Sequence, residues 1–270
     1  MLSDSAVTAI GVVFYIVLLL AGGYIYVSLI RQISAGRSTS FDTPVKTFGL
    51  PEAVLAALLI SLLLLNVGAS FSRPSTDISS GSLLSSLVVT LGVVIFIAGL
   101  LTLRGLSLEA LAGFSRLGIV RAITTGMILL FAAYPLISLA DVITQHLLGS
   151  GSSRQNIVEL FNSSRTIQQR IIIIVFAVTV APIAEEFIFR FFLYGVVKRY
   201  FGRFFGIVFT AMLFAVVHTH LPSFAALFVL GSCFAIAYEW SGSILVSMTM
   251  HSFFNALNLI FLAFPHTFEQ

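Results

Sequence analysis

The chain has 270 residues, of which 58% are hydrophobic and only 9% are charged, whereas about a quarter of the residues in a soluble domain carry a charge. This composition excludes a soluble globular fold. The formal net charge of +3 comes from Lys and Arg residues scattered between apolar stretches, which is not the footprint of a nucleic-acid-binding protein. The single cysteine, Cys233, excludes a disulfide within the chain and a Cys-rich metal site.

Apolar stretches long enough to cross a bilayer follow one another along the chain. A helix needs about 20 residues to span about 30 Å of hydrocarbon, and lipid favours helices because their backbone groups are paired internally. We therefore predict an all-α bundle of about eight transmembrane helices embedded in the lipid bilayer. Their expected limits are 6–30, 51–71, 82–103, 119–140, 168–193, 204–221, 223–239 and 243–264.

The placement of basic residues predicts the orientation of the bundle. If the N-terminus lies outside, the inner segments carry nine Lys or Arg residues and the outer segments four, and the last of the fourteen, Arg190, lies within a span. Positively charged segments favour the cytoplasmic side. We expect a multi-pass protein of a prokaryotic cell membrane, with both termini outside if the number of spans is even.

Ionisable residues inside the apolar spans are the first candidates for function. Glu185, Glu186 and Arg190 lie within the fifth span, where a charge is costly and usually functional. Glu186 and Arg190 are four residues apart, so they can also form an ordinary structural salt bridge on one helical face. Glu185 is rotated by about 100° from Glu186 and faces elsewhere. Pro182 is expected to kink the helix just before this group.

Two histidines and an asparagine lie inside later spans. His218 is near the end of the sixth span, while His251 and Asn255 share one face of the eighth. A lone histidine in a membrane helix is most often a hydrogen-bonding partner between helices. Together with Glu185, however, these residues supply a base for water and donors toward an oxyanion, which peptide hydrolysis requires. Glu185, His218 and His251 are also acceptable zinc ligands, so a glutamate mechanism and a metal mechanism both stay open.

The expected spans also predict the depth of these residues. At 1.5 Å per residue, Glu185 and His251 each lie about 12 Å from the inner ends of their spans, and Asn255 about 18 Å. His218 lies about 21 Å from the inner end of its span, so it fits the group least well. The group as a whole is expected in the inner half of the bilayer, toward the cytoplasm.

Signatures of other proteases are missing from the sequence. It contains no HExxH zinc helix and no GxSxG nucleophile elbow. Its aspartates all lie at span ends or in loops, which leaves no intramembrane pair: Asp4, Asp42, Asp77 and Asp141. Serine and aspartate mechanisms are therefore not expected.

Three short motifs in successive spans resemble those of a known family, the type II CAAX prenyl endopeptidases and their bacterial relatives, the CPBP intramembrane proteases. The resemblance covers about residues 170–260. The matching residues are Glu185, Glu186 and Arg190 in the fifth span, Phe214 and His218 in the sixth, and His251 and Asn255 in the eighth.

This resemblance implies a membrane-embedded endopeptidase and a role for each motif. Glu185 would activate water with the help of His218, while His251 and Asn255 would stabilise the oxyanion or complete the site. The other two residues of the first motif would support the site. Members of the family are named as metalloproteases, so zinc is the cofactor to consider beside a metal-independent mechanism.

The resemblance also divides the chain into N-terminal membrane helices, residues 1–167, and a catalytic core, residues 168–264. The expected partners are the bilayer and a membrane-associated protein or peptide substrate, of the prenylated CAAX type by resemblance. Two other functions stay open on the residues alone. One is an ion-coupled transporter that uses the same buried charges, and the other is a non-catalytic membrane scaffold of the same fold.

Overall fold

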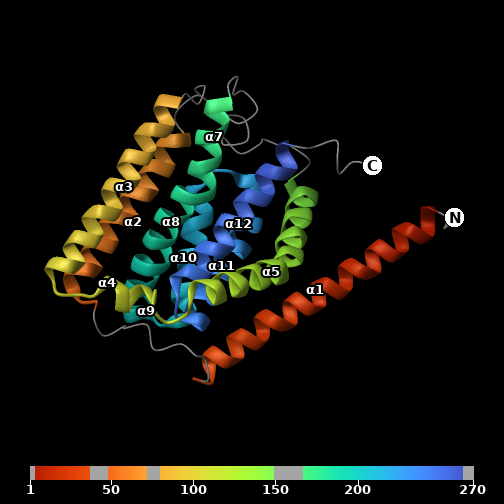
Figure 1. Ribbon diagram of the computed structural model, residues 1–270, viewed down its shortest axis with the longest axis horizontal. Coiled ribbons are helices and arrows are strands. Elements are labelled where there is room, and N and C mark those ends of the chain that lie inside the picture. Colours follow the sequence, from red (N-terminus) through yellow and green to blue (C-terminus); the bar gives the residue numbers. More distant parts are fainter. Residues whose placement is uncertain (1–3, 37–47, 72–79, 149–166, 264–270) are drawn as a thin grey trace.

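The computed structural model describes residues 4–36, 48–71, 80–148 and 167–263, and every regular element in these ranges is helical (Figure 1). Seven of the helices are long and apolar enough to cross a membrane. The predicted all-α, multi-pass fold is confirmed. The elements of the N-terminal part are α1 (Asp4–Ser34), α2 (Leu50–Phe71), α3 (Ser80–Leu103), α4 (Leu108–Ala112) and α5 (Ile119–Leu148).

A single helix of 35 residues, Ile167–Phe201, carries the first motif. It is continuous but changes pitch twice, through two π-helical segments. Its parts are α7 (Ile167–Val175), η1 (Phe176–Val180), α8 (Ala181–Glu186), η2 (Phe187–Leu193) and α9 (Tyr194–Phe201). Short π-helical segments inside α-helices often mark functional sites. The fifth span was expected to end at residue 193, and the structure extends it to Phe201.

The remaining elements are α10 (Arg203–Val217), η3 (Leu221–Ser223), α11 (Phe224–Ser241) and α12 (Ile244–Ala263). The sixth expected span, 204–221, is the short helix α10. Its 15 residues rise about 22 Å, less than the thickness of the hydrocarbon layer. The chain leaves the helix because Thr219 adopts a left-handed backbone with φ 52° and Pro222 follows shortly afterwards.

The buried core lies where α10, α11 and α12 pack against the long helix, with α5 packed on α11 and α12. Helix α1 packs against α5 and α11, with Tyr26, Leu29 and Ile33 buried, while its N-terminal half projects away from the bundle (Figure 1). Helices α2 and α3 stand on the opposite side of the bundle from α1 (Figure 1). The motif-bearing helices are therefore enclosed by other helices.

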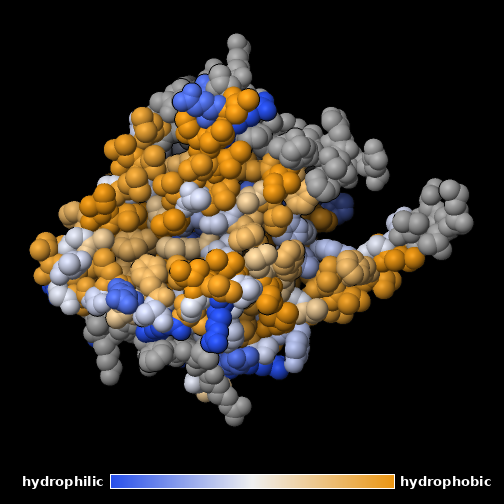
Figure 2. Space-filling model, viewed as in Figure 1, coloured by the Kyte–Doolittle hydropathy of each residue, from blue (hydrophilic) through white to orange (hydrophobic). Residues whose placement is uncertain are grey.

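The outer surface is that of a protein surrounded by lipid. Large apolar side chains are exposed along α1, α2, α3 and α5. In Figure 2 apolar side chains cover most of the visible face, and hydrophilic ones gather toward its upper and lower ends. A soluble protein rarely exposes such wide apolar patches, so this surface agrees with the membrane location.

Candidate active site

The fold brings the first and the third motif into direct polar contact. Glu185 and Glu186 end α8, and His251 lies in the second turn of α12. The Nδ1 atom of His251 lies 3.0 Å from Oε1 of Glu186, and its Nε2 atom lies 3.8 Å from Oε2 of Glu185. The imidazole therefore stands between two neighbouring carboxylates.

Glu186 and Arg190 form the predicted ion pair inside the protein. Nη1 of Arg190 lies 3.1 Å from Oε1 of Glu186, and both side chains are at most 1% exposed. The same carboxylate oxygen contacts His251. Two buried charges thus offset each other, which is needed because an unpaired charge in such surroundings is very unfavourable.

Aromatic rings enclose this ion pair. The guanidinium carbon of Arg190 lies 4.4 Å from the ring centre of Phe214 and 5.1 Å from that of Phe234. The Phe234 ring also lies 5.0 Å from the His251 ring at 30°. The Phe214 ring meets His251 edge to face at 5.7 Å. Because both rings are fully buried, they fix Arg190 and His251 and exclude water from them.

Glu185 differs from Glu186 in its access to the surroundings. Its side chain is 28% exposed, whereas that of Glu186 is fully buried. Nevertheless its Oε2 atom is buried and has no hydrogen-bond partner within the described ranges. Buried polar atoms are nearly always paired, and the nearest charged partner of this oxygen in the described part of the chain is Nε2 of His251 at 3.8 Å.

His218 contacts the same Phe214 ring that His251 contacts. Its Nδ1 atom lies 2.7 Å from the carbonyl oxygen of Phe214, and because a carbonyl only accepts, Nδ1 donates and Nε2 is the acceptor of the neutral ring. The ring centres of Phe214 and His218 are 4.6 Å apart. No hydrogen bond or ion pair joins His218 to Glu185 in the described part of the chain. The expected pairing of these two residues stays a prediction.

Asn255 contacts the long helix away from the carboxylates. Its Nδ2 atom donates a hydrogen bond of 2.8 Å to the backbone carbonyl of Ala177, which lies in η1. His251 and Asn255 are one turn apart on α12, so this helix touches the first-motif helix at two successive levels.

The side chains proposed as zinc ligands do not gather into a metal site. Among the described residues, no group of three or more His, Cys, Asp or Glu side chains has the geometry to hold a metal ion. Nδ1 of His251 contacts Glu186, and the Phe214 ring contacts both His251 and His218. Zinc held by Glu185, His218 and His251 therefore does not fit this arrangement.

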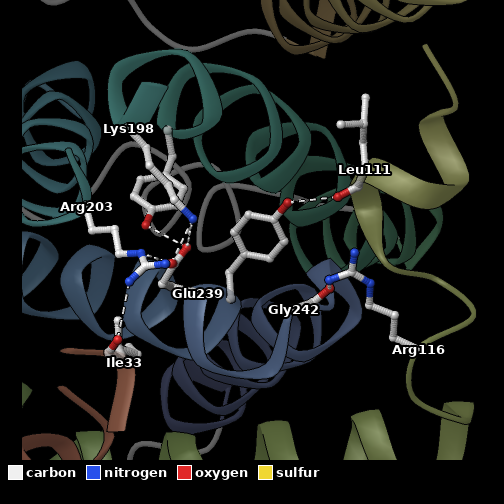
Figure 3. Close-up of polar contacts among 9 residues, drawn as sticks. Ile33, Leu111, Arg116, Lys198, Arg203, Glu239 and Gly242 are labelled. Carbon is white, nitrogen blue, oxygen red and sulfur yellow. Dashed lines mark hydrogen bonds and ion pairs between the residues drawn. The ribbon is translucent and has the colours of Figure 1, made fainter. Parts of the chain in front are cut away.

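A second buried ion cluster lies toward the basic end of the bundle (Figure 3). Glu239 on α11 is 1% exposed and lies 2.8 Å from Nζ of Lys198 and 3.0 Å from Nε of Arg203. It also accepts a hydrogen bond of 2.8 Å from the Tyr194 hydroxyl. Arg203 reaches on to the Ile33 carbonyl of α1 at 3.4 Å. Three helices, α9, α10 and α11, therefore meet at one carboxylate, and Arg203 connects this cluster to α1.

The sequence did not identify Glu239 as the ion-pair partner of Lys198 and Arg203, because those two basic residues were used only to predict the orientation of the bundle. It also did not identify Phe234 and the Ala177 carbonyl. Glu239 could have been found because it lies within an apolar span, which is the same feature that identified Glu185 and Glu186.

Comparison with known families supports the motif assignment. Residues 167–257, about a third of the chain, match the family model described as type II CAAX prenyl endopeptidase Rce1-like. The match confirms the resemblance over this segment, which holds all three motifs, while α1 to α5 lie outside it. No curated protein and no solved structure matches the chain.

Proposed function

Because residues 167–257 match the type II CAAX prenyl endopeptidase model, we propose that this multi-pass membrane protein hydrolyses a peptide bond in a membrane-associated protein or peptide. The family name suggests a substrate with a prenylated C-terminal CAAX sequence. One observation carries the proposal. A partly exposed carboxylate, Glu185, faces the Nε2 atom of a histidine whose other nitrogen contacts a buried carboxylate.

The two neighbouring glutamates would have different roles in catalysis. Glu185 has the access to reach a water molecule, so it acts as the general base. Glu186 is buried and already engaged with His251 and Arg190, so it orients the histidine. A carboxylate bound to one ring nitrogen of a histidine fixes the orientation of the other nitrogen, here Nε2 of His251.

The reaction then needs only these side chains and water. Glu185, assisted by His218, takes one proton from water as the water oxygen adds to the substrate carbonyl carbon. In its protonated form, His251 donates through Nε2 to the oxyanion that develops. The carbon–nitrogen bond breaks, and the leaving amine takes the proton from Glu185.

The test compares cleavage by the purified protein in proteoliposomes with that of Glu185→Gln and His218→Ala. A prenylated CAAX peptide and its unprenylated counterpart serve as substrates. Loss of a general base typically lowers kcat by about 10²- to 10⁴-fold, and we expect a loss in this range for Glu185→Gln. Glu109→Gln, which alters an exposed glutamate of α4, is the control and should cleave like the parent. Unchanged cleavage by both site variants would contradict the proposal and favour the scaffold.

A further inference from the structure

The long helix loses one backbone hydrogen bond just before the two glutamates. At the end of η1 the Ala181 N–H donates to the Phe176 carbonyl, five residues earlier. The same spacing would pair the Ala177 carbonyl with the nitrogen of residue 182. That residue is proline, which has no N–H. The Ala177 carbonyl is therefore left without its donor in the helix.

A side chain from another helix takes the place of that donor. Asn255 on α12 donates through Nδ2 to the Ala177 carbonyl at 2.8 Å. An unpaired carbonyl in lipid surroundings would be costly, and a neighbouring helix is a usual source of the missing partner. One turn away on α12, His251 contacts Glu186 at 3.0 Å. Asn255 thus holds η1, the segment just before α8, and His251 holds the last residue of α8.

We infer that Asn255 is a positioning residue that replaces the N–H missing at Pro182 and so fixes α8, which presents Glu185 to His251. This role rests on the proposed function of Glu185. It differs from one of the two roles that the family resemblance implies, in which Asn255 itself stabilises the oxyanion. The positioning role and the oxyanion role predict different effects of Asn255→Ala when residue 182 is changed to one that has an N–H.

A double-mutant cycle between Asn255→Ala and Pro182→Ala distinguishes the positioning role of Asn255 from a direct contact with the oxyanion. Alanine at position 182 supplies the missing N–H, so Ala177 no longer needs Asn255. In the parent background, Asn255→Ala should lower kcat about tenfold or more through misplacement of Glu185, with KM little changed. In the Pro182→Ala background the same change should lower kcat less than about threefold. The control is Asn258→Ala, an exposed asparagine on the same helix, which should match the parent.

Thermal unfolding of the four proteins in detergent gives a readout that does not depend on peptidase activity. Loss of one hydrogen bond should lower the midpoint by about 2–4 °C in the parent background and by less than half as much with alanine at position 182. Equal losses of kcat and of midpoint in both backgrounds would overturn the inference. If the parent cleaves no substrate, the proposed function fails, while the coupling in the midpoints still supports or contradicts the contact.

Discussion

Arg190 shows how a single residue can be both buried and charged in this protein. Its side chain is 1% exposed, and its charge is offset by one carboxylate and by the faces of two phenylalanine rings. Its Nη2 atom also donates to the Gly231 carbonyl at 3.4 Å. The planar guanidinium can satisfy all of these partners at once, whereas a lysine ammonium cannot.

We predict that Arg190→Met destabilises the protein by about 3–5 kcal/mol, because it leaves Glu186 buried without its cation. Arg190→Lys keeps the charge but loses the contact with the rings, so its loss should be smaller. Chemical unfolding in detergent micelles measures both effects. Arg199→Met, on an exposed basic residue of α9, is the matched control, and equal stability of all three variants would contradict the prediction.

Contacts between residues close in sequence were predictable, and contacts across helices were not. The pairing of Glu186 with Arg190 follows from their spacing of four on a helix, and the structure confirms it. The position of Phe234 against Arg190 depends on how α11 packs on the long helix. Among 26 phenylalanines, nothing in the sequence distinguishes this one, because packing partners carry no local pattern.

At the scale of the elements, the length of the long helix brings the expected depths of Glu185 and His218 into agreement. With the helix running to Phe201, Glu185 lies about 24 Å from its inner end. His218 lies about 22 Å from the start of α10, so the two now match. The sequence-based estimate placed Glu185 too close to the end, because Lys198 was expected in a loop. Instead it is 4% exposed and paired with Glu239.

The Glu239 cluster holds α9, α10 and α11 together at the basic end (Figure 3). We predict that Glu239→Gln lowers the thermal midpoint by several degrees, because Lys198 stays buried without its counter-charge. Arg203 is 40% exposed and can turn toward water. A second change, Lys198→Met, should therefore restore part of the loss.

The matched control for this prediction is Glu109→Gln, which removes an exposed carboxylate from α4. It should leave the midpoint unchanged. A double variant less stable than Glu239→Gln alone would show that the Lys198 charge is not the source of the loss.

At the scale of the whole molecule, the bilayer made the fold class predictable from composition alone. Long apolar stretches have few alternatives to helices in lipid, so seven of the eight expected spans are present as helices of sufficient length. Helix α10 is the exception, since its end is set by the left-handed Thr219 and by Pro222 rather than by hydropathy. The orientation of the bundle depends on how many helices cross the membrane. Because α10 is short, the orientation is the property that should be tested directly.

We predict that the basic end of the bundle faces the cytoplasm, as the distribution of Lys and Arg indicates. Gln168 and Arg199 lie near the two ends of the long helix, and both are exposed. A cysteine at position 199 should react with a membrane-impermeant maleimide in inside-out vesicles, and one at position 168 only in right-side-out vesicles. The native Cys233 is 3% exposed and should stay unlabelled. His146→Cys, near the C-terminal end of α5, should behave like the position 168 variant. The opposite labelling pattern would contradict the predicted orientation.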